Sequence, residues 1–113
     1  MLHMVVITHG PDTCPASHPE NREPSRYAHE NIDQVAKKLS ITVHGWWVDP
    51  PAHVFYILAD APNAHAVNTL VSDLRLFLWN TIDIHPVMTM AEAMQVAARA
   101  REARAAENAA GAG

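Results

Sequence analysis

The sequence predicts one α+β domain, in which a four-stranded antiparallel sheet carries two helices on one face. Its 113 residues are enough for one hydrophobic core and too few for two. A hydrophobic content of 49% against 18% charged residues is typical of a folded protein. Apolar patterns with strand and helix periodicity follow one another in the order β-α-β-β-α-β-α.

The first strand and the first helix are separated by a long connection. A β-branched apolar run over residues 2–9 predicts the strand, and Gly10-Pro11 ends it. Residues 10–24 contain four prolines without sustained periodicity, and so long a connection in a small domain is often functional. Pro24 suits the first turn of a helix. The apolar positions of that helix follow helical spacing: Ala28, Ile32, Val35, Ala36 and Leu39.

The middle of the chain predicts a hairpin, a helix and a fourth strand. Aromatic and β-branched runs at residues 42–48 and 53–60 are separated by a proline-stiffened turn. Asn63 can cap the next helix, and residues 81–88 form the last strand. The apolar stripe of this helix is expected to lie in the core: Val67, Leu70, Val71, Leu74, Phe77 and Leu78.

A final helix begins at a capping box formed by Thr89 to Glu92. The Ala-, Arg- and Glu-rich stretch 97–113 is expected to fray into a disordered tail. The domain proper is therefore assigned to residues 1–96. Two split crossovers order its strands as 4-1-3-2, which is a ferredoxin-like fold.

The sheet face away from the helices needs a cover, because strands one and three are apolar at nearly every position. A second copy's sheet is the usual cover, so we expect a homodimer. Four aromatic residues suit such an interface, and they could also fill the monomer's core or line a pocket: Trp46, Trp47, Phe55 and Tyr56.

Two segments of the second half resemble uncharacterised bacterial proteins of the dimeric α+β barrel superfamily. They are HVFYILADAPNAHAV at 53–67 and DIHPVMTMAEA at 83–93. The resemblance implies a ferredoxin-like dimer. The superfamily also contains heme-degrading enzymes, cofactor-free quinol monooxygenases and heme-dependent peroxidases. The resembling segments build the fold, however, so no catalytic residue of those enzymes carries over.

Charge and apolar content argue against several partners. A net charge of −4 provides no positive field for nucleic acid or an anionic membrane. No apolar run approaches the roughly 20 residues that cross a bilayer, and residues 1–7 lack the basic flank of a signal peptide. A lone cysteine, Cys14, cannot form an internal disulfide, which agrees with a cytoplasmic location.

The connection after the first strand concentrates side chains that ligate metals. His9, Cys14 and His18 lie there with two carboxylates. Imidazole and thiolate together suit zinc, copper or iron, whereas calcium and magnesium prefer oxygen ligands. Because strands three and four run antiparallel to strand one, their first residues meet its last, and His53 and His85 are expected at that edge.

Other interpretations of this loop stay open. Its histidines could be ordinary surface or interface residues, with the prolines stiffening an exposed loop. Cys14-Pro15 could ligate heme, or Cys14 could be a redox thiol or nucleophile activated by His9 or His18.

The leading prediction is a homodimer that binds Cu, Fe or Zn through His9, Cys14 and His18, with His53 or His85, for redox or oxygen chemistry. One alternative is a monooxygenase-like or heme-dependent oxidoreductase with an aromatic pocket between sheet and helices. The other is a non-catalytic dimer that binds a small apolar ligand or a protein partner.

Overall fold

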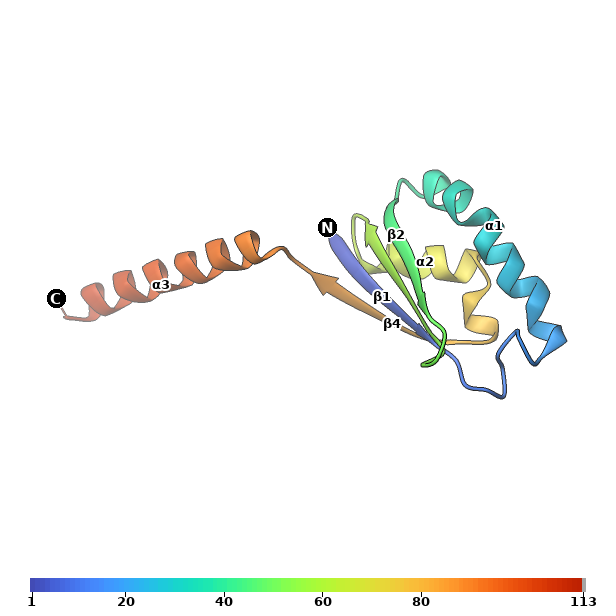
Figure 1. Ribbon diagram of the computed structural model, residues 1–113. Helices are drawn as coiled ribbons and strands as arrows, with labels where there is room; N and C mark the ends of the chain where they lie inside the picture. The colour runs from blue at the N-terminus through green and yellow to red at the C-terminus, as the bar shows by residue number, and fades with distance from the viewer. Residues whose placement is uncertain (113) are drawn as a thin grey trace.

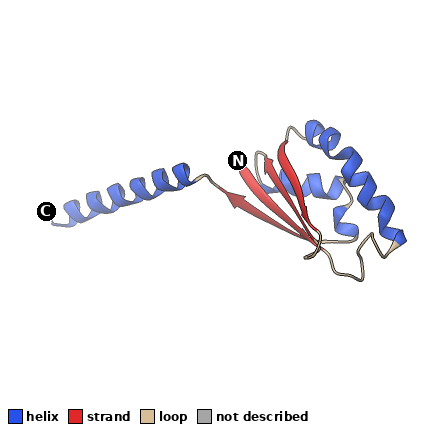
Figure 2. Ribbon diagram, viewed as in Figure 1, coloured by secondary structure: helices blue, strands red, loops and turns tan. Residues whose placement is uncertain are grey.

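A four-stranded sheet with helices on one face forms the body of the computed structural model, which describes residues 1–112 (Figures 1 and 2). All neighbouring strands are antiparallel, in the order β2-β3-β1-β4, so the predicted ferredoxin-like topology is confirmed. The elements are β1 (Leu2–Thr8), η1 (Pro19–Asn21), α1 (Arg22–Lys38), β2 (Thr42–Asp49), β3 (Val54–Asp60), α2 (Ala64–Asp73), η2 (Leu76–Leu78), β4 (Thr81–Val87) and α3 (Met90–Ala112).

The core lies between the sheet and the helices α1 and α2. Alternate residues of β1 point to it, and His3, Val5 and Ile7 are fully buried. A strand places successive side chains on opposite faces, so Leu2, Met4 and Val6 lie on the other face, half-exposed. No described element covers that open face (Figure 1). Among residues 1–112, no helix is long and apolar enough to cross a membrane.

The second helix is shorter than the apolar stripe predicts. It ends at Asp73, because Arg75 adopts a left-handed conformation with φ 60° and the chain continues in η2. This change of direction buries Leu76 and Trp79 and turns Phe77 and Leu78 outward, 47% and 71% exposed. The prediction that Phe77 and Leu78 lie in the core was therefore wrong.

The first helix begins earlier than predicted, at Arg22 instead of Pro24. The single-turn η1 directly precedes it and starts at Pro19, where proline's fixed φ suits a helical first turn. The connection without regular structure is correspondingly shorter than expected.

The last helix extends away from the body of the molecule (Figure 1). Its predicted capping box is present, because Thr89 Oγ1 accepts from the Glu92 N–H at 3.1 Å and donates to Glu92 Oε1 at 3.0 Å. The helix is continuous to Ala112, and this arm gives the molecule extents of 71 × 30 × 19 Å. Fraying of residues 97–112 stays a prediction, and Gly113 lies outside the described residues.

The cap of α2 provides a test of local stability. The Asn63 side chain accepts a hydrogen bond from the Ala66 N–H at 2.9 Å, which satisfies one of the free amides of the first turn. We expect Asn63→Ala to lower the free energy of unfolding by about 1 kcal/mol, measured by urea denaturation. Asn63→Asp, which preserves the acceptor, is the control; equal losses in both variants would contradict a capping role.

Candidate metal site

Three segments meet at the edge of the sheet where β1 ends. Thr8 pairs with Val54 on one side and with Thr81 on the other. The next residue, His9, continues the ladder, because its N–H donates to the His53 carbonyl at 3.1 Å. The antiparallel register therefore brings His9, His53 and the residues before β4 to one edge, as the topology predicted for His53 but not for His85.

His9, Cys14 and His53 form a cluster of potential metal ligands. One ligand atom from each of the three lies within 4.8 Å of the other two. The His9 Nε2 and His53 Nδ1 atoms are 3.3 Å apart. Two nitrogens bound to zinc at about 2.0–2.1 Å in a tetrahedron would be separated by about 3.3–3.4 Å. The two imidazoles thus already have the spacing that a tetrahedral metal ion requires.

His9 lies partly buried among aromatic rings. The centroid of its ring is 5.1 Å from those of His53 and Trp79 and 5.7 Å from that of Phe55. Its Nδ1 is 3.2 Å from Asn80 Oδ1. The pKa of His9 is lowered, mainly because burial disfavours the charged ring. The hydrogen bond to Asn80 opposes this decrease, and the charge of His53 adds to it. The lowered pKa favours the neutral ring, which is the state that binds metals.

His53 has an unusual backbone conformation for its type. Its φ is 56°, in the left-handed region, and its N–H donates to the Pro50 carbonyl at 3.2 Å. Non-glycine residues in this region are uncommon and cost free energy, and they cluster at functional sites. The turn that ends the β2–β3 hairpin thus holds the imidazole at the edge despite this strain.

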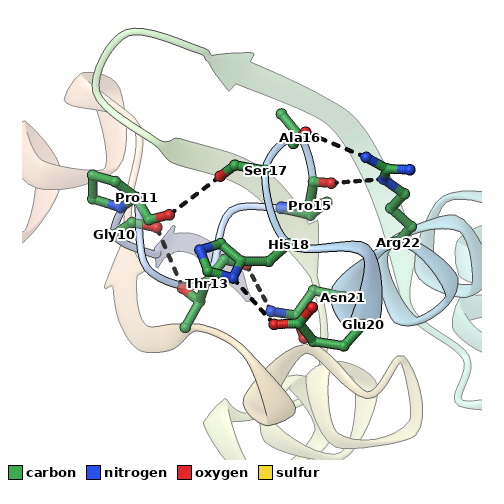
Figure 3. A network of polar contacts seen from close by, with 10 residues as sticks. All are labelled: Gly10, Pro11, Thr13, Pro15, Ala16, Ser17, His18, Glu20, Asn21 and Arg22. Carbon is green, nitrogen blue, oxygen red and sulfur yellow. Dashed lines mark hydrogen bonds and ion pairs between the residues drawn. The ribbon is translucent and has the colours of Figure 1, made fainter.

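The loop that carries Cys14 is fixed by side-chain hydrogen bonds (Figure 3). Asn21 Nδ2 donates to the Thr13 carbonyl at 2.7 Å, and Arg22 Nε donates to the Pro15 carbonyl at 3.1 Å. The Cys14 carbonyl accepts from the N–H groups of Ser17 and His18. The start of α1 therefore anchors the residues on both sides of Cys14.

Two other predicted ligands lie outside this cluster. His18 is paired with the carboxylate of Glu20, with His18 Nδ1 and Glu20 Oε1 3.1 Å apart. His85 lies opposite Met4 on the open face of the sheet, because β4 already begins at Thr81. The carboxylate of Asp49 accepts a hydrogen bond from the Ala52 N–H within the hairpin turn.

Three of the four predicted aromatic residues line a groove between α1 and the edge strand β2. Trp46, Trp47 and Phe55 enclose about 250 Å³ together with Ser25, His29 and Val48. Tyr56 pairs with Val6 and Trp47 and alternates with Phe55 along β3. It therefore does not line this groove.

Asn80 and Trp79 belong to the site, and the sequence interpretation did not name them. Both precede β4, at the edge where the topology places the ends of the strands. They also line a polar groove of about 390 Å³ that includes His9, Asp12 and Thr13. The topological argument that found His53 could have found Asn80, if applied to the residue before β4 instead of to histidines alone.

Comparison with known proteins gives a family and a fold. Residues 1–101 match the family model described as "Domain of unknown function (DUF3303)". The chain belongs to this family. A solved structure, "Crystal structure analysis of SCO4226 from Streptomyces coelicolor A3(2)", is similar with a TM-score of 0.51 and 22% identity, over 77% of this chain and 96% of that chain. No curated protein matches the chain. Membership of the dimeric α+β barrel superfamily stays a prediction.

The environment of His9 makes a prediction for NMR titration. In metal-free protein we expect the His9 ring to titrate below the ordinary value of about 6.5, because burial disfavours its charged form. His53→Asn should raise the His9 pKa by removing a neighbouring positive charge, and asparagine tolerates the left-handed backbone at this position. The shift should vanish in urea; a His9 that titrates identically in folded and unfolded protein would contradict the assignment.

Proposed function

We propose that this protein binds a transition metal ion through His9, Cys14 and His53. The observation that supports the proposal is the convergence of two imidazoles and one thiol, from two segments distant in sequence, to within 4.8 Å. Nitrogen and sulfur donors together suit zinc, copper or iron. The two donor nitrogens already have the 3.3 Å separation that a tetrahedral ion needs. On binding, both rings would turn their lone pairs toward the ion, and the Cys14 sulfur would move closer.

Three protein donors favour a reactive site over a purely structural one. Structural zinc sites have four protein ligands, whereas catalytic sites have three and leave one position for water or substrate. His9 also borders the polar groove that contains Asp12, Thr13 and Asn80, which lies beside one of the three proposed ligands. A copper or iron ion at this position could perform the redox or oxygen chemistry that the sequence suggests.

Metal analysis of the purified wild-type chain tests the proposal. After exposure to Zn²⁺ or Cu²⁺ and dialysis without chelators, we expect about one ion per chain. Cys14→Ala and His53→Asn should each abolish stoichiometric binding. With Co²⁺ as a probe, a sulfur-to-metal charge-transfer band should appear in the wild type and be absent in Cys14→Ala.

Matched controls come from the two histidines outside the cluster. His18→Asn and His85→Asn should bind metal as the wild type does, because neither ring lies with the three donors. A wild-type chain that stays metal-free after loading would refute the proposed function. Loss of metal in His18→Asn or His85→Asn, with retention in His53→Asn, would refute the ligand set.

We further propose that two copies associate through the open face of the sheet. A compact protein of 12.4 kDa is expected to expose roughly 6,100 Å², whereas this chain exposes 7376 Å². The excess is larger than the roughly 800 Å² that each partner buries in a standard interface, and the exposed α3, which extends away from the body, contributes to it. The open face contributes apolar residues from β1 and β3: Leu2, Met4, Val6, Tyr56 and Leu58.

Sedimentation equilibrium tests this association. We expect the wild type to have about twice the mass of one chain. Val6→Glu should produce a folded monomer, because it places a charge at the centre of the open face and leaves the core untouched. Gln95→Glu, on the exposed surface of α3, is the control and should remain dimeric. A monomeric wild type at concentrations of about 100 μM would exclude this interface as a stable one.

A further inference from the structure

The hydrogen bonds around Asn80 determine where the protons of the metal-free site lie. Asn80 Nδ2 is 3.0 Å from the carbonyl oxygen of Leu76. A carbonyl oxygen only accepts hydrogen bonds, so the amide nitrogen must face it. Leu76 is 1% exposed, which gives Asn80 an anchor inside the core. The orientation of the Asn80 amide is therefore fixed, with Oδ1 pointing at His9.

The orientation of Asn80 fixes the tautomer of His9. Asn80 Oδ1, which can only accept, lies 3.2 Å from His9 Nδ1. The proton of the neutral His9 ring therefore lies on Nδ1, and Nε2 has a free lone pair. That lone pair faces His53 Nδ1 at 3.3 Å, so in the metal-free state His53 donates its Nδ1–H to it.

We infer that Asn80 is a positioning residue that presents His9 Nε2 to the metal, and that the metal replaces the proton shared by the two rings. This inference rests on the proposed function. On binding, His9 retains its Nδ1–H and its hydrogen bond to Asn80. His53 changes tautomer, because its proton leaves Nδ1 for Nε2 and Nδ1 becomes a ligand. No net charge change of either ring is required.

The arrangement has a physical advantage for binding. Metal-ligating histidines usually donate their second ring N–H to a neighbouring acceptor, which orients the ring and raises the basicity of the ligating nitrogen. Asn80 provides that acceptor for His9. Because the inter-ring hydrogen bond already holds the two nitrogens at the separation that a tetrahedral ion needs, the spacing of these two ligands is set before the ion arrives.

Nitrogen-15 NMR of the histidine rings tests the inference directly. In metal-free wild type we expect a protonated Nδ1 on both His9 and His53. Addition of Zn²⁺ should leave the His9 pattern in place, shift its Nε2 resonance, and move the His53 proton to Nε2. A His9 ring found in the Nε2–H form without metal would overturn the inference, whatever the metal affinity.

Substitutions of Asn80 separate positioning from general stability. Asn80→Leu has a similar size but no acceptor, so His9 should lose the Nδ1–H tautomer and the Zn²⁺ affinity should fall roughly 10–100-fold. Asn80→Asp preserves an acceptor for the His9 Nδ1–H and should restore the tautomer. It has no N–H to donate to the Leu76 carbonyl, so its Zn²⁺ affinity should lie between those of the wild type and Asn80→Leu. Asn31→Leu is the matched control, because Asn31 Nδ2 also donates to a backbone carbonyl, that of Tyr27. This variant should change neither the His9 tautomer nor the Zn²⁺ affinity.

The outcomes also distinguish this inference from the proposed function. A wild type with the expected tautomers that binds no Zn²⁺ would refute metal binding and the exchange of proton for metal, while the role of Asn80 in fixing the ring would stand. If Asn80→Leu binds Zn²⁺ as tightly as the wild type does, the role of Asn80 in binding is overturned and the proposed function is left intact. If Asn80→Leu does not fold, the spectra of the wild type and of Asn80→Asp decide.

Discussion

The antiparallel pairing of β1 with both β3 and β4 is the constraint on which the site depends. It aligns the last residue of β1 with the first residues of its two neighbours, and the backbone hydrogen bond from His9 to His53 extends the alignment past the strand ends. Side chains alternate between the two faces of a strand, so a slip of one residue would turn His9 to the open face and away from Phe55 and Trp79. The chemistry of the edge therefore follows from the register of the sheet.

The surroundings of His9 affect the ring in two ways: aromatic residues bury it, and two polar side chains supply its hydrogen-bond partners. Burial beside Phe55 and Trp79 removes water from it, which favours the neutral, metal-binding form. A buried polar ring without partners would be costly, and here Asn80 and His53 supply them. The groove beside His9 is polar and open to solvent. His9 is thus packed against aromatic rings and also borders a groove that is open to solvent.

The residues that build the fold and the residues of the candidate site lie in different parts of the chain. The fold is shared with the SCO4226 structure at 22% identity, whereas the candidate ligands lie on loops and a turn outside the strands, where function is often located. Cys14 is held by hydrogen bonds between side chains and the backbone, not by the sheet. Local periodicity predicted the strands and helices well. It failed at the end of α2, because the left-handed Arg75 interrupts a stripe that still looks helical in sequence.

The sequence by itself determined the order of strands and helices, since periodicity is a local property of the chain. It also placed two candidate ligands, His9 and Cys14, in one connection. Only the tertiary structure decided which distant residues complete the cluster. His53 joins it because its turn meets the end of β1, whereas His85 lies on the open face because β4 begins several residues before it. Asn80 enters the site for the same reason as His53. Register and turn geometry depend on contacts between segments, and no local pattern encodes them.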